Sequence, residues 1–177
     1  MQKQVEITSI FTETIEKLKG PGVILLAGNP PNPMTIGWGT IGYIWGRMIF
    51  TALVRPSRFT FSLIDSATEF TVNLLPAEFE SQVNLCGTTS GRDVDKIKKC
   101  GFDLEHGILI AAPYLKESFI HYECRIIHKS DLVPGTIDKA IIKKYYSEDD
   151  FHRVFFGEII GAFKNPANWL TYESVDV

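Results

Sequence analysis

The sequence is poor in the features that mark several common classes of protein. Its three cysteines, Cys86, Cys100 and Cys124, are widely spaced and form no CxxC pair, so neither a disulfide framework nor a zinc or dithiol motif is indicated. We expect three reduced, mostly buried thiols. No apolar run reaches roughly 18 residues, so no transmembrane helix is expected.

Charge and motif content exclude further classes. The net charge of −3 disfavours a nucleic-acid binder, because a phosphate backbone demands a clear basic excess. No GxGxxG follows a predicted strand and no Walker lysine motif occurs, so the common modes of nucleotide binding are not supported. The N-terminus lacks the apolar region of a signal peptide, so a cytoplasmic location is the expectation. His106, His121 and His128 show no metal-ligand spacing and are expected at surface or strand positions.

What the chain does contain is a set of β-rich segments. With 177 residues it is expected to form one domain, residues 1–177, with a sizeable core. The apolar and β-branched runs predict strands at Val23–Ala27, Met48–Val54, Phe70–Leu75, Phe119–His128 and Phe151–Phe163. Within Phe119–His128, alternation predicts that His121 and Glu123 lie on the face opposite Tyr122. Gly157 and Gly161 are expected at bulges or close approaches.

The predicted helices are short and fill the connections. One begins after Ser57 as N-cap and runs to about Ala67. The others are expected at about residues 77–86, 92–100 and 139–146, the second of them ending at Gly101. No regular strand–helix alternation is visible. The pattern therefore favours a mainly β fold, a β-barrel with peripheral helices, over a doubly wound sheet.

The most informative stretch runs from Asn32 to Arg58. Small and hydroxyl residues alternate there with large rings in NPMTIGWGTIGYIW. Glycines let the backbone approach a flat ligand, whose polar edge then bonds to backbone amides. The structural alternative is an aromatic strand–turn–strand in which the glycines serve only as bulges.

Two basic, serine-containing segments accompany this stretch. Arg55-Pro56-Ser57-Arg58 can place an anion at a helix N-terminus, or it can be a capped helix with two solvated arginines. Ser90-Gly91-Arg92-Asp93-Val94-Asp95-Lys96 offers hydroxyl and guanidinium donors, and its aspartates can equally be acids of a first helical turn. Together the segments indicate a ligand with a planar ring system at one end and a phosphate at the other.

His152 lies at the head of the last aromatic strand, from which a side chain can reach a ligand pocket. No Ser/His/Asp or Cys/His pairing can be placed from spacing, so nucleophilic catalysis has no support.

The order of these motifs resembles the flavin reductase-like, FMN-binding split-barrel family, and most of all its flavoredoxin branch. The resemblance rests on N-x-M-T-x-x-W, then R-P-S-R, then F-x-V-N-L at residues 70–74, then S-G-R-D-x-D-K, and on H-x-x-x-x-G-E at residues 152–158. It covers roughly residues 20–162. Each motif is weak singly, and their order and spacing make the set specific.

The resemblance implies a Greek-key split β-barrel that forms a homodimer with FMN at or near the subunit interface. The Met34–Trp38 segment would line the isoalloxazine ring, and the arginines and serines of the two basic segments would hold the phosphate. His152, the one candidate catalytic residue, would help to place a nicotinamide or would balance charge near the ring. The cofactor-binding residues expected on this basis are Met34, Thr35, Ile36, Gly37, Trp38, Arg55, Pro56, Ser57, Arg58, Asn73, Ser90, Gly91, Arg92 and Lys96.

One position departs from the family pattern. Many members carry Asn-Thr-Met-Thr or Asn-Val-Met-Thr, whereas Pro33 here stiffens the loop and removes one amide donor. The implied functions are an NADH- or NADPH-dependent FMN reductase, an FMN electron carrier served by a redox protein, or a flavin-binding domain without catalysis. The flavin itself carries the redox chemistry, so the absence of a strong acid–base constellation is consistent with all three.

Overall fold

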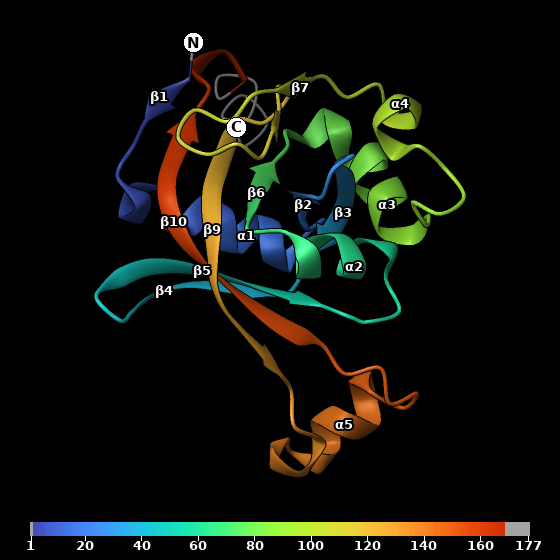
Figure 1. Cartoon of the computed structure of the whole chain (residues 1–177). Helices are drawn as coiled ribbons and strands as arrows, with labels where there is room; N and C mark the ends of the chain where they lie inside the picture. Colours follow the sequence, from blue (N-terminus) through green and yellow to red (C-terminus); the bar gives the residue numbers. More distant parts are fainter. Residues whose placement is uncertain (1, 169–177) are drawn as a thin grey trace.

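The structure, a computed structural model, describes residues 2–168 and consists of strands with short helices between them (Figure 1). The strands are β1 (Lys3–Gln4), β2 (Val23–Ala27), β3 (Asn32–Ile36), β4 (Gly39–Ile44), β5 (Arg47–Val54), β6 (Glu69–Leu74), β7 (Leu104–Glu105), β8 (Tyr114–Leu115), β9 (Ile120–Asp131) and β10 (Arg153–Lys164). The helices are α1 (Phe11–Lys19), α2 (Phe59–Ser66), α3 (Glu80–Thr88), α4 (Lys96–Cys100) and α5 (Lys139–Tyr145), with 3-10 turns η1 (Ile7–Ile10), η2 (Ala77–Phe79) and η3 (Pro134–Thr136).

The main sheet is antiparallel and curls into a split barrel. Its strands follow the order β3-β2-β6-β9-β10-β5-β4, and β1 adds to β10. The two ends of this order, β3 and β4, are joined by Gly37 and Trp38, and the Trp38 carbonyl accepts a hydrogen bond from Leu53 N at 3.3 Å. The expected mainly β, Greek-key split barrel with peripheral helices is confirmed.

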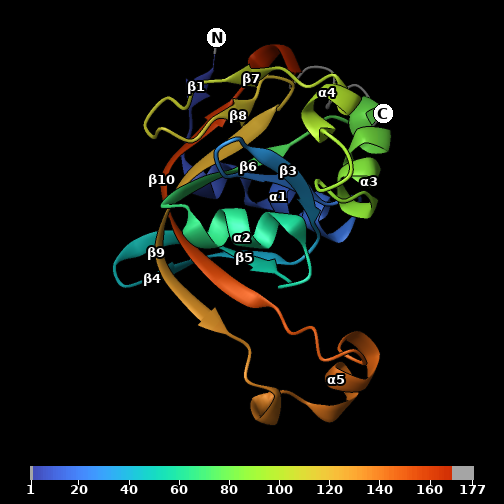
Figure 2. The same cartoon turned by 45° about the vertical axis from the view of Figure 1, so that its right-hand side comes forward.

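Two apolar clusters fill the fold. The larger lies within the barrel and includes Phe50, Phe70 and Phe155, each fully buried. The smaller lies between the sheet and the pair α3 and α4, and it contains Val83, Cys86, Phe102 and Leu115, with Phe79 packed against it. Since burying a side chain of this size stabilises by roughly 1.5–3 kcal/mol, these clusters fix α3 and α4 on the outside of the barrel (Figures 1 and 2).

The predicted strands are confirmed, with one error in the assignment of faces. Alternation in β9 placed His121 and Glu123 opposite the core, but both side chains are fully buried. The reason is that the chain around β8 covers this face of β9. The His121 ring stacks on Tyr114 at a centroid distance of 3.9 Å, and Glu123 accepts hydrogen bonds from Ile108 N and Leu109 N at 2.6 and 2.7 Å.

Three helix starts differ from the predicted ones. The helix expected after Ser57 begins at Phe59, and Ser57 does not cap it. The helix expected at residue 77 is a 3-10 turn followed by α3. The helix expected at residue 92 begins at Lys96, because Asp95 accepts a hydrogen bond from Lys98 N and caps it there. Its end at Gly101, which has a φ of 68°, is confirmed.

Strands β9 and β10 extend beyond the barrel and carry an arm, here defined as residues 132–152, that includes α5 (Figures 1 and 2). The neck of the arm is held by Arg153, whose guanidinium donates to Asp131 at 2.6 and 2.9 Å and to Asp65 at 2.9 Å. Lys129 Nζ lies 3.3 Å from the same Asp65 carboxylate. These contacts fasten both strands of the neck to α2.

Within residues 2–168, no helix has the length and apolarity that crossing a bilayer requires. Over the same range, no three His, Cys, Asp or Glu side chains gather in a way that could hold a metal ion.

Gly157 and Gly161 occupy irregular positions of β10, as predicted. The pairing of β9 with β10 shifts register at both. A Cβ atom on Gly157 would lie 2.6 Å from Phe70 Cζ and 2.8 Å from Cys124 Cβ. The glycine therefore lets β10 lie directly on the barrel core.

Gly157→Ala is expected to destabilise the fold by about 1–3 kcal/mol, since a methyl group must displace a packed ring. Urea denaturation measures the free energy of unfolding. Gly42→Ala is the matched control, because a Cβ atom at Gly42 of β4 meets no atom within 4 Å. Equal stability of the two variants would contradict the close packing at Gly157.

Candidate functional site

The segment after β2 forms one wall of a cavity of about 240 Å³. β3 supplies its first residues, β5 supplies Leu53 and Val54, and His152, just before β10, also lines it. The lining residues are Met34, Thr35, Ile36, Gly37, Trp38, Leu53, Val54, Arg55, Arg58 and His152. We call this the ring cavity, because the sequence predicted a ligand with a planar ring system.

A second cavity, of about 120 Å³, adjoins the first. Its lining residues are Met34, Ser57, Arg58, Phe59, Thr60, Thr88, Thr89, Ser90, Gly91, Arg92 and Lys96. Met34 and Arg58 line both cavities, so the two lie side by side. We call this one the cation cavity.

Close packing at Gly91 brings the loop before α4 against the start of α2. A Cβ atom at Gly91 would lie 2.2 Å from Asn32 Oδ1 and 2.5 Å from Phe59 Cδ1. The glycine is therefore required for space, since its φ is not positive. Arg92, on the same loop, lies over the Phe59 ring at 5.6 Å and donates to the Ser57 carbonyl at 3.4 Å.

Two of the three cations of this cavity are held by carbonyls near the end of α3. Lys96 is buried and its ammonium donates to the Cys86 carbonyl at 3.1 Å. Arg58 donates to the carbonyl of Gly87. Burial lowers the pKa of Lys96, and the nearby Arg58 lowers it further. A cation that is costly to bury gains from an anion placed beside it.

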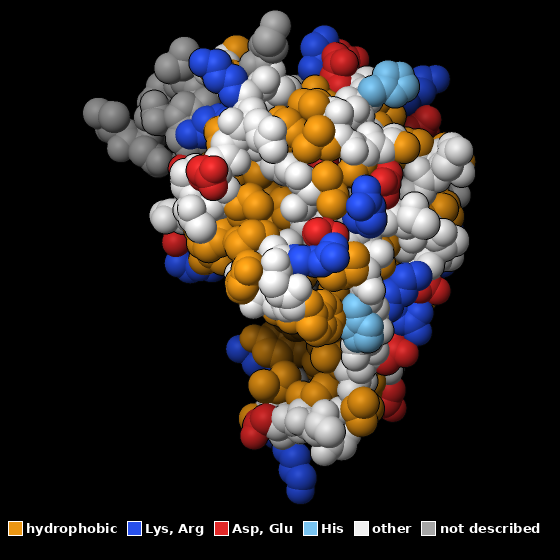
Figure 3. Space-filling view, turned by 60° about the vertical axis from the view of Figure 1, so that its left-hand side comes forward, with side chains coloured by type: hydrophobic (Ala, Val, Ile, Leu, Met, Phe, Trp, Pro, Cys, Tyr) orange, Lys and Arg blue, Asp and Glu red, His pale blue; other side chains and the backbone are white. Residues whose placement is uncertain are grey.

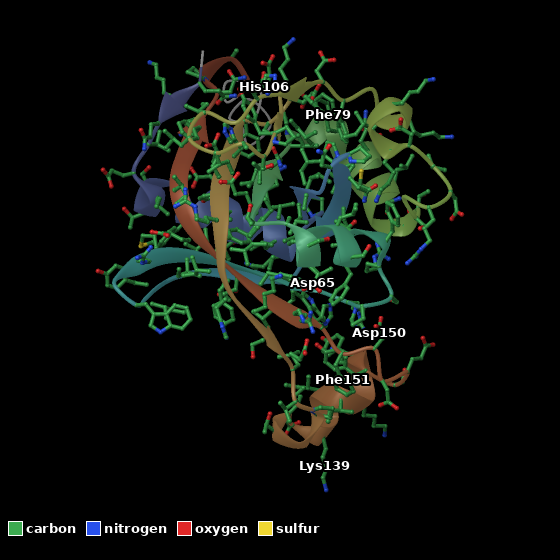
Figure 4. The ribbon with its side chains drawn as sticks, viewed as in Figure 1. Asp65, Phe79, His106, Lys139, Asp150 and Phe151 are labelled. Atoms are coloured by element: carbon green, nitrogen blue, oxygen red, sulfur yellow. The ribbon has the colours of Figure 1, made fainter. Side chains whose placement is uncertain are left out.

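Ser57 is engaged by the arm. Its hydroxyl donates to Asp150 Oδ2 at 2.6 Å, and its backbone N–H donates to Oδ1 at 3.3 Å. Figure 4 shows Asp150 at the junction of the arm and the barrel. A carboxylate thus takes the donors that the sequence assigned to a phosphate, which is also why Ser57 does not cap α2.

Arg55 is likewise directed toward the arm. Its guanidinium donates to the carbonyls of Asp150 and Tyr145 at 2.8 Å each, and it lies 5.0 Å from the centre of the Tyr146 ring. Arg55 therefore lines the ring cavity while it anchors α5, instead of standing free for a phosphate.

Rings from three elements meet at one end of the ring cavity. Trp38 contacts Tyr145 edge-on at a centroid distance of 5.0 Å and lies 4.9 Å from the His152 ring. The Tyr146 hydroxyl lies 2.9 Å from His152 Nδ1. Burial, with a smaller effect of Arg55, lowers the pKa of His152 to about 4, so its imidazole is neutral at pH 7.

Of the predicted site residues, all but Pro56 and Asn73 line one of these two cavities. Asn73 is fully buried in β6, where its amide donates to Ile24 O at 3.3 Å and accepts from Leu115 N at 2.9 Å. Asn73 therefore links β6 to β2 and β8, and it lines neither cavity. Pro33 lies in β3 at the end of the strand order, a position that tolerates a proline.

Sequence reasoning missed several lining residues. Thr88 and Thr89 directly precede the Ser90 motif, and this run of hydroxyl groups was a usable signal. Asp150 and Tyr146 line neither cavity but hold Ser57 and Arg55, and no sequence signal pointed to them. They lie about ninety residues from these partners and reach them only through the arm.

A larger cavity, of about 800 Å³, opens elsewhere on the molecule. Leu63, Glu69, His106 and Pro113 are among its lining residues, and His106 lies at the end of the molecule opposite the arm (Figure 4). It shares no residue with the two cavities of the site.

The fold and the paired cavities define a split β-barrel protein with one aromatic and one cationic compartment. The chain belongs to the flavin reductase like domain family, whose pattern matches residues 17–173.

Three solved structures show the similarity. Flavoredoxin from Methanosarcina acetivorans is 25% identical with a TM-score of 0.65, over 81% of this chain and 68% of that one. An FMN-binding protein from Thermus thermophilus, with bound p-hydroxybenzaldehyde, is 21% identical with a TM-score of 0.62, over 81% and 71%. An NADH:FAD oxidoreductase from Streptomyces globisporus, in complex with NAD and FAD fragments, is 20% identical with a TM-score of 0.60, over 82% and 74%.

The low pKa of His152 predicts a pH dependence of stability. The unfolded chain, whose histidine has an ordinary pKa near 6.5, binds more protons than the folded one between about pH 6.5 and 4. The free energy of unfolding should therefore fall as the pH is lowered through this window. Denaturation at several pH values measures it, and His152→Gln should flatten that part of the profile. An NMR titration that places the His152 pKa above 6 would contradict the prediction.

Proposed function

We propose that this protein binds FMN across the ring and cation cavities and transfers electrons from NADH or NADPH to flavin or to an acceptor. The observation that carries the proposal is the sharing of Met34 and Arg58 by an aromatic cavity and a cationic one. The alternative within the same site is an electron carrier of the flavoredoxin type, which receives electrons from a redox protein and oxidises NAD(P)H slowly.

The cation cavity fits a phosphate. Arg58, Arg92 and Lys96 line it together with the hydroxyl-bearing residues Ser57, Thr88, Thr89 and Ser90. Guanidinium, ammonium and hydroxyl donors are those that a phosphate dianion accepts. The buried ammonium of Lys96 adds a reason for an anion here, since its charge is partly desolvated.

The ring cavity fits a planar ring system. Met34 and Trp38 offer apolar surface, and the backbone of residues 35–37 lies along the wall, where Gly37 carries no side chain to obstruct approach. Arg55 is held near one end of this cavity by its contacts with the arm. A positive charge near a flavin ring is one of the ways in which a protein tunes its potential.

When bound, the flavin supplies the hydride and electron chemistry. The chain binds it, orients it and shields it from water. His152 contributes a neutral imidazole, and the hydrogen bond of 2.9 Å between its Nδ1 and the Tyr146 hydroxyl fixes the orientation of the ring. Arg55 supplies positive charge at the same end of the cavity, where a nicotinamide nucleotide is proposed to enter.

The ligands and the names of the three similar structures support this proposal. One is an FMN-binding protein, one is a flavoredoxin, and one is an NADH:FAD oxidoreductase. The preference for FMN over FAD rests on a cation cavity that suits a terminal phosphate. A single domain and a cytoplasmic location, both expected from the sequence, stay predictions.

The test is the visible spectrum of the purified protein after addition of FMN, followed by anaerobic addition of NADH or NADPH. The proposal expects a flavin spectrum that bleaches on addition of one nicotinamide. Rapid turnover with added free flavin favours the reductase, and tight flavin retention with slow NAD(P)H oxidation favours the carrier. Absence of FMN binding in calorimetry would overturn both.

Two variants that each remove one charge, from Arg92 of the cation cavity and from Asp150 beside it, should change FMN affinity in opposite directions. Arg92→Gln should weaken FMN by about ten- to hundredfold, because a charge-assisted bond contributes roughly 1.5–3 kcal/mol. Asp150→Asn should strengthen FMN, because it removes a negative charge from the donors of Ser57. Calorimetric titration with FMN and with riboflavin measures both effects. Riboflavin, which lacks the phosphate, is the control, and equal effects on the two flavins would contradict the assignment of the cavity.

We further propose that the functional unit is a homodimer. The tip between β4 and β5 exposes Tyr43 and Trp45, at 71% and 61%, and the arm exposes Val133 and Ile141, at 58% and 47%. Figure 3 shows hydrophobic side chains across this side of the molecule and a hollow where the arm leaves the barrel. Apolar surface of this kind is typical of interfaces, and two-fold pairing is the commonest arrangement.

Light scattering should give a mass about twice the 19.9 kDa of the chain. Tyr43→Ser together with Trp45→Ser should shift the mass toward the monomer, because the apolar contact is lost. A wild-type protein that is monomeric with FMN bound would contradict the dimer.

A further inference from the structure

Two cysteines that are 14 residues apart in the sequence meet between α3 and α4. Cys86 Sγ and Cys100 Sγ lie 3.9 Å apart, which is van der Waals contact. Cys86 is fully buried in the smaller apolar cluster, and Cys100, half-buried, is the last residue of α4. The third cysteine, Cys124, is buried in the larger cluster within the barrel. The chain thus holds one thiol pair and one isolated thiol.

The pair brackets the loop that builds the cation cavity. Between Cys86 and Cys100 lie six of the residues that line this cavity: Thr88, Thr89, Ser90, Gly91, Arg92 and Lys96. The carbonyl of Cys86 itself accepts the hydrogen bond from the Lys96 ammonium, and the next carbonyl, that of Gly87, accepts from Arg58. The backbone at Cys86 therefore orients two of the three cations.

We propose that Cys86 and Cys100 form a reversible intramolecular disulfide by exchange with low-molecular-weight disulfides, and that this bond fastens the loop of the cation cavity. The second half of the proposal rests on the proposed binding of FMN phosphate in that cavity. The first half, the formation of the bond, does not depend on any flavin.

The exchange is a balanced two-step reaction. The Cys100 thiolate attacks one sulfur of a small disulfide RS–SR, so that a Cys100–SR bond forms and the other RS⁻ leaves. Cys86 then loses its proton to water and attacks Cys100 Sγ, which forms the protein disulfide and expels the second RS⁻. The two protein thiols lose two electrons and two protons, and the small disulfide is reduced to two RSH.

The order of attack follows from exposure. Burial raises the pKa of the Cys86 thiol to about 12, and burial also raises that of Cys100. Cys100 is the more accessible thiol, so it meets the incoming disulfide and Cys86 resolves the mixed disulfide. The positive charge of Lys96 has the opposite effect: it lowers the pKa of both thiols and so favours their thiolates. Because the thiolate is the attacking species, exchange should be slow at pH 7 and should accelerate toward pH 9.

The geometry allows the sulfurs to close. A disulfide needs the sulfurs at about 2.05 Å, so they must approach by roughly 2 Å. α4 spans only five residues, and Cys100 is half-buried at its end. The approach therefore requires a small movement of a short helix toward the longer α3.

The first experiment measures the bond itself. The reduced full-length protein is incubated without flavin in oxidised glutathione, and its intact mass and non-reducing peptide map are recorded. We expect the mass to fall by two hydrogens, with Cys86 linked to Cys100, and the rate to rise with pH. Dithiothreitol should reverse the change. Cys124→Ala, the matched control, should behave as the wild type, and Cys100→Ser should form no internal link.

Other products would overturn the proposal. A glutathione adduct that persists on Cys100 would show that Cys86 does not resolve it. A disulfide between chains, or one that involves Cys124, would show that the observed pair is not the reactive one. Circular dichroism of Cys100→Ser confirms that the variant is folded, which is expected because Cys100 lies at the edge of its cluster.

The second experiment measures the coupling to the cation cavity. FMN dissociation is followed by fluorescence for the oxidised and the reduced protein. A loop fastened at both ends is more preorganised, so the oxidised form should release FMN at least about threefold more slowly. Treatment of the Cys100→Ser variant with oxidised glutathione should leave its rate of FMN dissociation unchanged. Equal rates in both wild-type forms would overturn the coupling, whereas an absence of FMN binding to the reduced protein would count against the proposed function and leave the thiol chemistry intact.

Discussion

The pairing of β10 with both β9 and β5 is the constraint on which the candidate site depends. In this register Arg153 pairs with Val54, so the residues just beyond, His152 and Arg55, come together at the neck of the arm. The ion pairs of Arg153 with Asp65 and Asp131 hold this register at its open end. A slip by one residue would reverse the faces of β10 and would carry His152 away from Trp38.

The two cavities of the site are held in place by different kinds of contact. The cation cavity is built from three short segments, namely Met34 of β3, residues 57–60 and residues 88–96, and two of its three cations are held by carbonyls near the end of α3. The ring cavity is built from distant segments and is closed by aromatic contacts that involve the arm. The first part is held by bonds among the barrel and its helices, with one contact to the arm at Ser57, and the second depends on how the arm lies.

The success of sequence-based prediction follows the same division. Five of the strands, the β-barrel class and the lining residues from β3, β5 and the loop before α4 could be predicted, because local patterns determine them. Strands β3 and β4 were considered only as an alternative, because their glycines and rings also suit a ligand-binding segment. His152 was found because it stands at the head of a recognisable strand. Asp150 and Tyr146 could not be found, since their contacts with Ser57 and Arg55 depend on the length and path of the arm. The burial of His121 was missed for a related reason, because the face of a strand says nothing about a distant segment that covers it.

The arm leaves and re-enters the barrel at a single point, where Leu132 N donates to the His152 carbonyl at 3.1 Å. A connection of this kind can be long or short without any change in the strands that it joins, because the cost of loop closure grows slowly with length. The barrel and the loop before α4 can therefore stay constant while insertions at this one point vary. In evolutionary terms, exchanging the arm would change the residues at one end of the ring cavity and would remove Asp150 from Ser57, while the bonds of Arg58 and Lys96 to carbonyls near the end of α3 would remain.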